Sequence, residues 1–473
     1  MKLLKVYISA FCMCSLSVLL NSCDDFLKEE PLDMKSSDQF WKTKADAESG
    51  VNALYFGGVP YLHNTDVGGG WTPKATMWGG IVSGLYVDKR KDRTFTTASE
   101  GCNFNIESFD DIAMKYWHEF YKGISRANFV IANIPTMTGV LDEATINNYV
   151  AQGKFFRAYG YFWLVKEFGG VPYISEPYTS TEGMYKERLS AEEVYKKIEA
   201  DLLDIVNGDA LPNKTFYENG CYVTRAMAQT LLAQVYLQWA GAPLNGGADY
   251  YGKAAQMALK VINDSPHELI HPNGTTDDLS SAYNVIKTTK ESAEIIYAKE
   301  YNYTNYSVGN SYACRSIGTD AFQWGVFHPG GDVLYNAYLP CDMLLNSYAS
   351  NDIRGHEKQF FFKQYTDAEG KTYTLNNAGN WAWFDENALI SGHDGDYNMP
   401  VFRFAEVLLI AAEGLARTNH EDNAVGGAKY YLNQVRKRAG LADETATGND
   451  LIQSILTERL HELPLEFKIW DDI

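Results

Sequence analysis

Two short segments of this sequence carry residue types that can bind metal ions. In PHELIH, His267, Glu268 and His271 match the pattern H-E-x-x-H, which binds zinc when both histidines lie on one face of a continuous helix. Pro266 and Pro272 bracket the motif, and so short a helix between prolines would be a poor platform for a metal ion. We therefore predict a turn here and no zinc hydrolase site.

The second segment, HDGDYN, places Asp394, Asp396 and Asn398 at alternating positions, as at the start of a calcium-binding loop. The glycine that an EF-hand needs next is replaced by Met399, and the position of its bidentate glutamate holds Ala405. These replacements exclude an EF-hand. A simple acidic turn is the expectation, and a looser structural calcium site is the alternative.

Aromatic residues make up 14% of the chain, with 32 tyrosines and 10 tryptophans. Exposed flat rings can cover the apolar faces of pyranose sugars, while amides and carboxylates bond the hydroxyls. Two clusters, WTPKATMW and YNYTNY, offer such rings, and a further tryptophan follows the second cluster. The candidate ligand-binding residues are Trp71, Trp78, Tyr301, Tyr303, Tyr306 and Trp324. For each single ring, packing in the core is an equal alternative.

Trp381 and Trp383 are weaker candidates for the same role. Their alternation in WAW predicts a strand with both faces covered.

Enzyme signatures are missing from the sequence. It contains no G-x-S-x-G elbow, P-loop or dinucleotide fingerprint, and 60 acidic residues make any pair of carboxylates uninformative. We therefore predict a binding protein with no catalytic residue and no cofactor. The net charge of −19 argues against nucleic acid as a partner, because phosphates demand a basic surface.

The N-terminus has the features of a secretory signal. Lys2 and Lys5 precede an apolar run over residues 6–20, which is shorter than the roughly 20 residues that span a bilayer. Asn21, Ser22 and Cys23 then fit a lipobox, in which the cysteine is diacylated and the peptide is cut before it. We predict a signal peptide over 1–22, lipid on Cys23 and a flexible acidic tether over 23–37. Ordinary secretion with a free cysteine is the alternative.

Four cysteines remain beyond the signal and the anchor, and their scattered spacing fits no metal site. Export permits disulfides, but a core of this size does not need them, so we expect buried free thiols. These cysteines are Cys102, Cys221, Cys314 and Cys341.

Helical periodicity occupies two blocks, at 38–265 and 402–473, within one domain over 38–473. We predict helices over 38–55, 111–137, 145–168, 191–206, 225–240 and 249–263, and then over 402–417, 424–439 and 450–463. Small residues interleaved with bulky apolar ones predict a tetratricopeptide-like scaffold of helical hairpins. The segment 269–400 loses this period, and we predict a loop-rich ligand-binding insertion with a few short strands, such as 293–298.

Taken in order, these segments closely resemble the SusD/RagB family of outer-membrane nutrient-binding lipoproteins from Bacteroidetes. The middle of the chain matches loosely, through LPCDMLLNSYASNDIRG from Leu339. The matching segments are SCDDFLKEEPLD from Ser22, AQGKFFRAYGYFWLVKEFGGVPY from Ala151, LSAEEVYKKIEADL from Leu189, YVTRAMAQTLLAQVYL from Tyr222, RFAEVLLIAAEGLA from Arg403, YYLNQVRKRAGL from Tyr430 and ILTERLHELPLEFKIWDDI from Ile455. Family members usually continue beyond FKIWDDI, so a terminal segment is expected there.

The resemblance implies a mostly α-helical, non-catalytic receptor on the outer surface of the cell. It would capture an oligosaccharide and pass it to a TonB-dependent barrel of the SusC kind, over which it sits as a lid. In starch-binding relatives the ligand aromatics come from regions that correspond to the two clusters above. Asp24 and Asp25 look like the signal that sends such lipoproteins to the surface. A peptide or other nutrient receptor of the RagB kind, and a glycan hydrolase on the helical scaffold, are the alternatives.

Overall fold

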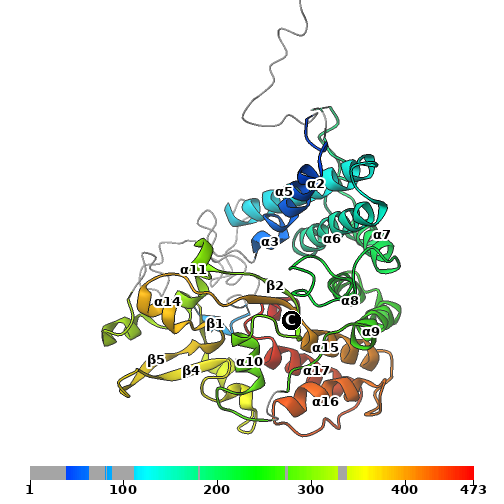
Figure 1. Cartoon of the computed structure of the whole chain (residues 1–473). Helices are drawn as coiled ribbons and strands as arrows, with labels where there is room; N and C mark the ends of the chain where they lie inside the picture. Colours follow the sequence, from blue (N-terminus) through cyan, green and yellow to red (C-terminus); the bar gives the residue numbers. More distant parts are fainter. Residues whose placement is uncertain are drawn as a thin grey trace, which may run out of the picture.

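The computed structural model describes residues 39–62, 80, 83–87, 111–178, 180, 182–271, 275–328 and 338–472 (Figure 1). The predicted signal peptide, Cys23, the tether, Trp71, Trp78 and Cys102 lie outside these residues. Within the described ranges, none of the helices has both the length and the apolar character needed to cross a membrane.

The first helical block forms a stack in which helices adjacent in sequence pack against one another. All six helices predicted for this block are confirmed, with ends shifted by a few residues at most positions. Its elements are α2 (Lys44–Asn52), η1 (Ala53–Tyr55), α3 (Val59–Leu62), α5 (Asp111–Asn133), η3 (Ile134–Thr136), α6 (Glu143–Phe168), α7 (Ala191–Val206), α8 (Arg225–Ala240) and α9 (Gly247–Asp264).

Local sequence sets where these helices begin and how closely they approach. Ser190 caps α7 in a capping box with Glu193, and Asp142 accepts a hydrogen bond from the amide of Thr145 at the start of α6. A Cβ atom at Gly160 of α6 would lie only 2.9 Å from a side-chain carbon of Ile124 in α5. The interleaved small residues therefore allow the close helix packing that the sequence predicts.

The second block completes the same scaffold. It contains α15 (Phe404–Ala416), α16 (Ala428–Arg438), α17 (Gly448–Glu462) and the short α18 (Ile469–Asp472). Every residue of α15 is buried, because this helix packs against α8 and α9 of the first block and against α16 and α17 of the second. Two blocks that are far apart in sequence thus share one hydrophobic core.

The described residues form three two-stranded antiparallel sheets, to which the insertion contributes every strand except β1 and the end of β6. They pair β1 (Tyr86–Val87) with β3 (Leu339–Pro340), β2 (Ile295–Lys299) with β6 (Met399–Arg403), and β4 (Phe361–Thr366) with β5 (Thr372–Asn380). The strand expected at 293–298 is confirmed as β2. The short helices of this segment are α10 (Ala282–Thr288), α11 (Tyr303–Tyr306), α12 (Tyr312–Arg315), η4 (Thr319–Trp324), α13 (Asp342–Leu345), η5 (Ile353–Gly355), η6 (Trp381–Trp383) and α14 (Glu386–Ser391).

The strand predicted at WAW is wrong. Trp381 and Trp383 lie in η6, a 3₁₀ turn that follows β5 directly. Trp381 donates a hydrogen bond of 2.7 Å from its indole to Asn284, and the ammonium of Lys287 lies 4.1 Å from its ring centroid. These contacts, made by a segment distant in sequence, favour the turn over a continued strand.

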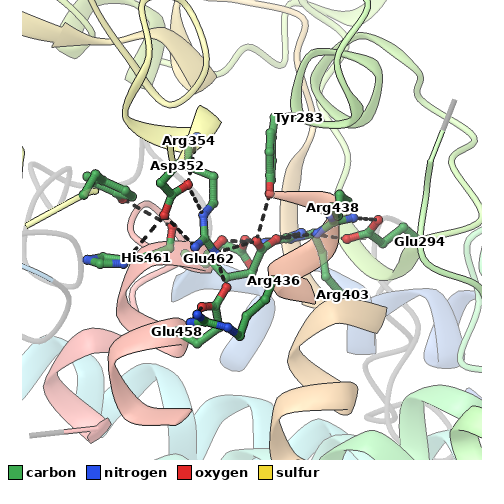
Figure 2. A network of polar contacts seen from close by, with 12 residues as sticks. Tyr283, Glu294, Asp352, Arg354, Arg403, Arg436, Arg438, Glu458, His461 and Glu462 are labelled. Atoms are coloured by element: carbon green, nitrogen blue, oxygen red, sulfur yellow. Dashed lines mark hydrogen bonds and ion pairs between the residues drawn. The ribbon is translucent and has the colours of Figure 1, made fainter. Parts of the chain in front are cut away.

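A buried network of ion pairs joins the insertion to the helical scaffold (Figure 2). Arg403, at the end of β6, contacts Glu294 at 2.7 Å and Glu462 of α17 at 3.0 Å. Arg438, at the end of α16, contacts the same two carboxylates, each at 2.5 Å. Since Glu294 immediately precedes β2, this half of the network holds the paired strands β2 and β6 against α16 and α17.

The other half of the network reaches the middle of the insertion. Arg354 of η5 forms ion pairs with Asp352 at 2.8 Å, Glu458 at 2.6 Å and Glu462 at 3.2 Å. Figure 2 shows the Glu462 carboxylate between the Arg354 guanidinium on one side and those of Arg403 and Arg438 on the other. Glu462 therefore connects three arginines that come from three separate segments of the chain.

Removing the charge of Glu462 should destabilise the protein strongly. A buried ion pair that loses one partner leaves the other charge desolvated and uncompensated, which typically costs about 3–5 kcal/mol. We expect Glu462→Gln to lower the free energy of unfolding by about that amount in urea denaturation. Glu192→Gln, which breaks an exposed pair with Lys196 on α7, is the matched control and should leave the midpoint almost unchanged. Equal effects of the two changes would contradict a central role for Glu462.

The same carboxylate should make the fold sensitive to acid. Burial acts to raise the pKa of Glu462, but Arg438, Arg403 and Arg354 outweigh it and lower the pKa from 4.5 to about 2. A carboxyl group whose pKa is lower in the folded state stabilises the fold above its unfolded pKa, and this contribution is lost as the pH falls toward the folded pKa. We expect the wild type to lose about 3 kcal/mol more than Glu462→Gln between pH 4.5 and pH 2. Parallel pH profiles of unfolding free energy for the two proteins would refute this assignment.

Candidate functional site

Among the described residues of the insertion, Tyr306 is the aromatic residue with a largely exposed side chain, and it lies in the short helix α11. This turn begins at Asn302, whose side chain accepts a hydrogen bond from the amide of Asn305 at 3.0 Å. It ends at Ser307, which adopts a left-handed conformation with φ of 55°. In Figure 1 α11 projects from the insertion beside α14. The chain thus presents a compact turn, built from the sequence YNYTNY, on the outside of the fold.

The segment HDGDYN holds this turn in place. Asp396 accepts hydrogen bonds from the amides of Tyr303 at 2.6 Å and Thr304 at 3.3 Å, and from the Thr304 hydroxyl at 2.5 Å. Asn398 accepts a further bond from the amide of Tyr301 at 3.0 Å. Burial acts to raise the pKa of Asp396, but the bonds from Thr304 and Tyr303 outweigh it and lower the pKa. The ionised carboxylate of Asp396, which is far from α11 in sequence, therefore caps the N-terminus of this helix.

The two tyrosines of α11 differ in how far their side chains are exposed. Tyr306 is 76% exposed, and Tyr303 is half-buried with its ring stacked on His393 at 4.4 Å between centroids and 16° between planes. The imidazole of His393 is itself held by a 2.7 Å contact between its Nδ1 and the backbone oxygen of Asp394. Stacking fixes the Tyr303 ring, so the turn offers one oriented and one freely exposed aromatic side chain.

A polar cluster adjoins the base of the turn. Glu300 accepts hydrogen bonds at Oε1 from the Tyr217 hydroxyl at 3.0 Å and from the Asn398 amide at 2.8 Å. Burial raises the pKa of Glu300, although these two bonds act in the opposite direction. Tyr217 comes from the loop before α8, so the scaffold contributes directly to this side of the site. Aromatic rings beside amides and a carboxylate are the groups that recognise a ligand with apolar faces and hydroxyls.

The other predicted aromatic residues are placed differently. Tyr301 is 2% exposed and belongs to a buried cluster with Tyr86 and Tyr338, so its ring is not available to a ligand in this structure. Trp324 stacks on Tyr373 at 4.8 Å, in a separate cluster between η4 and the β4–β5 hairpin. The structure therefore brings together Tyr303 and Tyr306 only, and Trp71 and Trp78 lie outside the described residues.

The structure also places the segment PHELIH, whose residues match the zinc-binding pattern H-E-x-x-H. His267, Glu268 and His271 lie in an irregular segment after α9, and the Nδ1 of His267 is 2.8 Å from the backbone oxygen of Ala293. The prediction that this motif is not on a helix is confirmed. In the described part of the chain, no three His, Cys, Asp or Glu side chains are grouped so as to hold a metal ion.

The calcium alternative at Asp394, Asp396 and Asn398 stays a prediction. The structure uses both carboxylate oxygens of Asp396 and the amide oxygen of Asn398 as acceptors for protein donors. A calcium ion bound there would compete with the bonds that order α11.

Two of the cysteines can be described. Cys221 and Cys341 are free and half-buried, so the expectation of free thiols holds for this pair, whereas the side chains of Cys102 and Cys314 lie outside the description.

His393, Glu300 and Tyr217 belong to the candidate site but were not predicted from the sequence. His393 stands at the start of HDGDYN and Glu300 directly precedes YNYTNY, so both adjoin segments that had been singled out. Tyr217 is contributed by the helical block, and no local pattern points to it.

Two family models match the chain. Residues 364–473 match the SusD family, and residues 81–237 match a family described as starch-binding associating with outer membrane. Together these matches span more than half of the 473 residues. A relative, SusD-like protein P2 of Formosa agariphila, is 27% identical over 476 residues that cover 97% of this chain and 88% of the relative. The chain belongs to the SusD/RagB family.

Solved structures of SusD-like proteins share its fold. A SusD superfamily protein from Parabacteroides distasonis superposes with a TM-score of 0.77 at 25% identity, covering 91% of this chain and 88% of that one. Surface glycan-binding protein A from Bacteroides thetaiotaomicron, in complex with laminarihexaose, has a TM-score of 0.68 at 21% identity, covering 91% and 90%. The mostly α-helical scaffold predicted from the sequence is therefore the SusD fold.

Loss of the Asp396 carboxylate should loosen the turn of this SusD-family protein. Replacing a helix-capping carboxylate by alanine typically costs about 0.5–2 kcal/mol, and here the loss falls on a single turn. We expect Asp396→Ala to speed amide hydrogen exchange in residues 301–307, measured by mass spectrometry. Asp209→Ala, at an exposed acid that pairs with Arg225, is the control and should not change exchange in this segment. Unchanged exchange in Asp396→Ala would show that α11 does not depend on the cap.

Proposed function

We propose that this chain is a receptor that binds a glycan through the aromatic turn α11. The observation that carries the proposal is the exposed Tyr306 next to Tyr303, which His393 holds in one orientation. Stacking of such rings on the apolar faces of pyranoses supplies contact area at low entropic cost. Asn398 and Glu300, at the base of the turn, bond to each other and support the two tyrosines from below. The SusD-like structure solved in complex with laminarihexaose supports this class of ligand.

The proposed role is binding without cleavage. Hydrolysis of a glycosidic bond needs two carboxyl groups free to act on the substrate from opposite sides. At this site the oxygens of Asp396 accept bonds from α11, and Oε1 of Glu300 accepts bonds from Tyr217 and Asn398. Carboxylates engaged in this way support the turn and suit a receptor better than a hydrolase.

The proposal extends to delivery of the ligand. A TonB-dependent SusC-like barrel in the outer membrane would receive the glycan, and lipid on Cys23 would hold the receptor at the cell surface. Support comes from the description of the family matched by residues 81–237, which names association with the outer membrane. A receptor tethered beside its transporter raises the effective concentration of bound ligand, so weak affinity is sufficient.

Binding should depend on Tyr306 and not on exposed tyrosines in general. A stacked ring contributes about 0.5–1.5 kcal/mol, so Tyr306→Ala should weaken binding of an oligosaccharide about two- to twelve-fold, with little change in melting temperature. Isothermal titration against a panel of oligosaccharides that includes laminarihexaose measures this. Tyr185→Ala is the matched control, because Tyr185 is 98% exposed and lies between α6 and α7.

Three results would contradict the proposal. Equal affinities of Tyr306→Ala and the wild type for the oligosaccharide would show that the glycan does not bind at α11. Release of reducing sugar from a bound glycan would indicate a hydrolase, and affinity for peptides without affinity for any glycan on the panel would indicate a receptor of the RagB kind.

A further inference from the structure

A lysine without a polar partner lies among aromatic rings at the end of α10. The ammonium of Lys287 is 4.1 Å from the ring centroid of Trp381. The centroids of Tyr397 and Phe384 are 5.1 Å and 5.8 Å from the same ammonium. Among the described residues, Lys287 forms no ion pair and its Nζ donates no hydrogen bond. The three N–H donors of this ammonium therefore remain available to a ligand.

The Lys287 ammonium can be reached from outside the protein. Its side chain is half-buried, and Nζ is not one of the fully enclosed, unpartnered polar atoms in the described part of the chain. Because Nζ has no protein partner, its remaining surface faces solvent. Burial nevertheless lowers the pKa of Lys287 to about 7, although the charges of Asp385 and Glu386 act in the opposite direction. An anion brought to this ammonium would offset the cost of its desolvation.

The two acids that act on Lys287 are engaged elsewhere. Oδ2 of Asp385 accepts a hydrogen bond from the amide of Asp396 at 3.0 Å. Oε1 of Glu386 accepts one from the Tyr365 hydroxyl. Neither carboxylate forms an ion pair with Lys287. The position of a direct counter-ion is thus not taken by either of them.

A second lysine increases the positive charge at the same ring. The ammonium of Lys358, which lies between η5 and β4, is 5.4 Å from the centroid of Trp381. It too has no ion pair with a residue that the structure describes. The chain has 60 acidic residues and a net charge of −19, so two unpaired ammonium groups at one ring mark a local excess of positive charge. Such an excess stabilises an anion placed beside it.

The rings leave little surface for a neutral sugar. Phe384 stacks on Trp381 with 5.0 Å between centroids and 16° between planes, and the two ammonium groups lie over the same indole. Stacking on a pyranose would need an uncovered ring face, whereas charge-assisted bonds to an oxyanion need only the N–H donors. With Asp385 and Glu386 nearby, a single negative charge fits better than a dianion such as phosphate. A carboxylate meets these requirements.

We propose that Lys287, assisted by Lys358, binds a carboxylate, either of a free small acid or of an acidic sugar. Lys287 donates the hydrogen bonds, and Lys358 adds attraction from a longer distance. One segment joins this site to the aromatic turn: Asp396 bonds to α11, whereas the ring of the next residue, Tyr397, contacts Lys287. The carboxylate site goes beyond the proposed glycan binding and does not depend on it.

The test measures binding of D-galacturonate to the full chain at pH 6 by saturation-transfer NMR. D-Galactose is the matched neutral sugar, and acetate is the free carboxylate. Lys287→Met should weaken D-galacturonate binding about tenfold or more, because a charge-assisted hydrogen bond is lost, and Lys358→Met should weaken it less. Lys197→Met, at an exposed lysine of α7, is the matched control and should bind as the wild type does.

The pH dependence of binding tests the role of Lys287 directly. A carboxylate binds the ammonium form, so the apparent affinity falls with the charged fraction of Lys287 as the pH rises through its pKa of about 7. We expect wild-type binding of D-galacturonate to weaken about tenfold from pH 6 to pH 8. Lys287→Arg stays ionised over this range and should lose much less affinity.

The other titratable groups at the site are common to these two proteins. They are Lys358, Asp385, Glu386, Tyr397 and His356. The pKa of His356 is raised by its hydrogen bond with the backbone oxygen of Ser350, so this group also titrates near neutral pH. Its titration changes both profiles alike, and the difference between the profiles therefore belongs to Lys287.

Several results would overturn the proposal. They are no binding of D-galacturonate, equal binding by Lys287→Met and Lys197→Met, parallel pH profiles of the wild type and Lys287→Arg, or binding of uncharged D-galactose that depends equally on Lys287. Acetate binding that depends on Lys287 would assign the site to free carboxylates, and binding of D-galacturonate without acetate would assign it to an acidic sugar. Tyr306→Ala should leave D-galacturonate binding unchanged, so failure of the glycan site and failure of the carboxylate site can be told apart.

Discussion

The insertion depends on charges that are buried where it meets the helical scaffold. Moving ionised groups out of water costs desolvation free energy, and this cost is offset only when each charge has partners at close range. Here Glu462 lies among Arg354, Arg403 and Arg438, each within 3.2 Å, and Glu294 closes the group. Such a set is satisfied in one arrangement of the segments only. It therefore fixes where β2, β6 and η5 lie relative to α16 and α17, and through β2 where the turn α11 is held.

The scaffold could be predicted from the sequence because its signals are local. Apolar periodicity and helix caps such as Ser190 depend on residues that are close together in sequence. The helices at 191–206 and 225–240 accordingly have the predicted bounds. The network could not be predicted in the same way. Its members, among them Glu294, Arg354 and Glu462, look like ordinary charged residues until the fold buries them. Burial of a charge is a property of tertiary structure, and periodicity does not reveal its partners.

For the candidate site, too, local patterns could be predicted from the sequence and tertiary contacts could not. YNYTNY was recognised as an aromatic cluster, but the sequence gives no means of separating Tyr301, which ends up in the core, from Tyr306, which lies at the surface. HDGDYN was predicted to form a simple acidic turn, with a looser calcium site as the alternative, whereas the structure uses Asp396 to cap a helix far away in sequence. A carboxylate that caps a remote helix and one that binds a cation have the same local pattern. Only the position of the donors distinguishes them.

The pairing of β2 with β6 brings Ile295 opposite Arg403 and so closes the chain between them into a loop. This loop is joined to the scaffold a second time through Arg354 of η5, which pairs with Glu458 and Glu462 of α17. Because the entropic cost of closing a loop rises only slowly with its length, residues of this loop away from β2, β6 and η5 can be added or lost at little cost to the stability of the helices. Such changes would alter the outer surface of the loop and leave its buried junction with the scaffold intact.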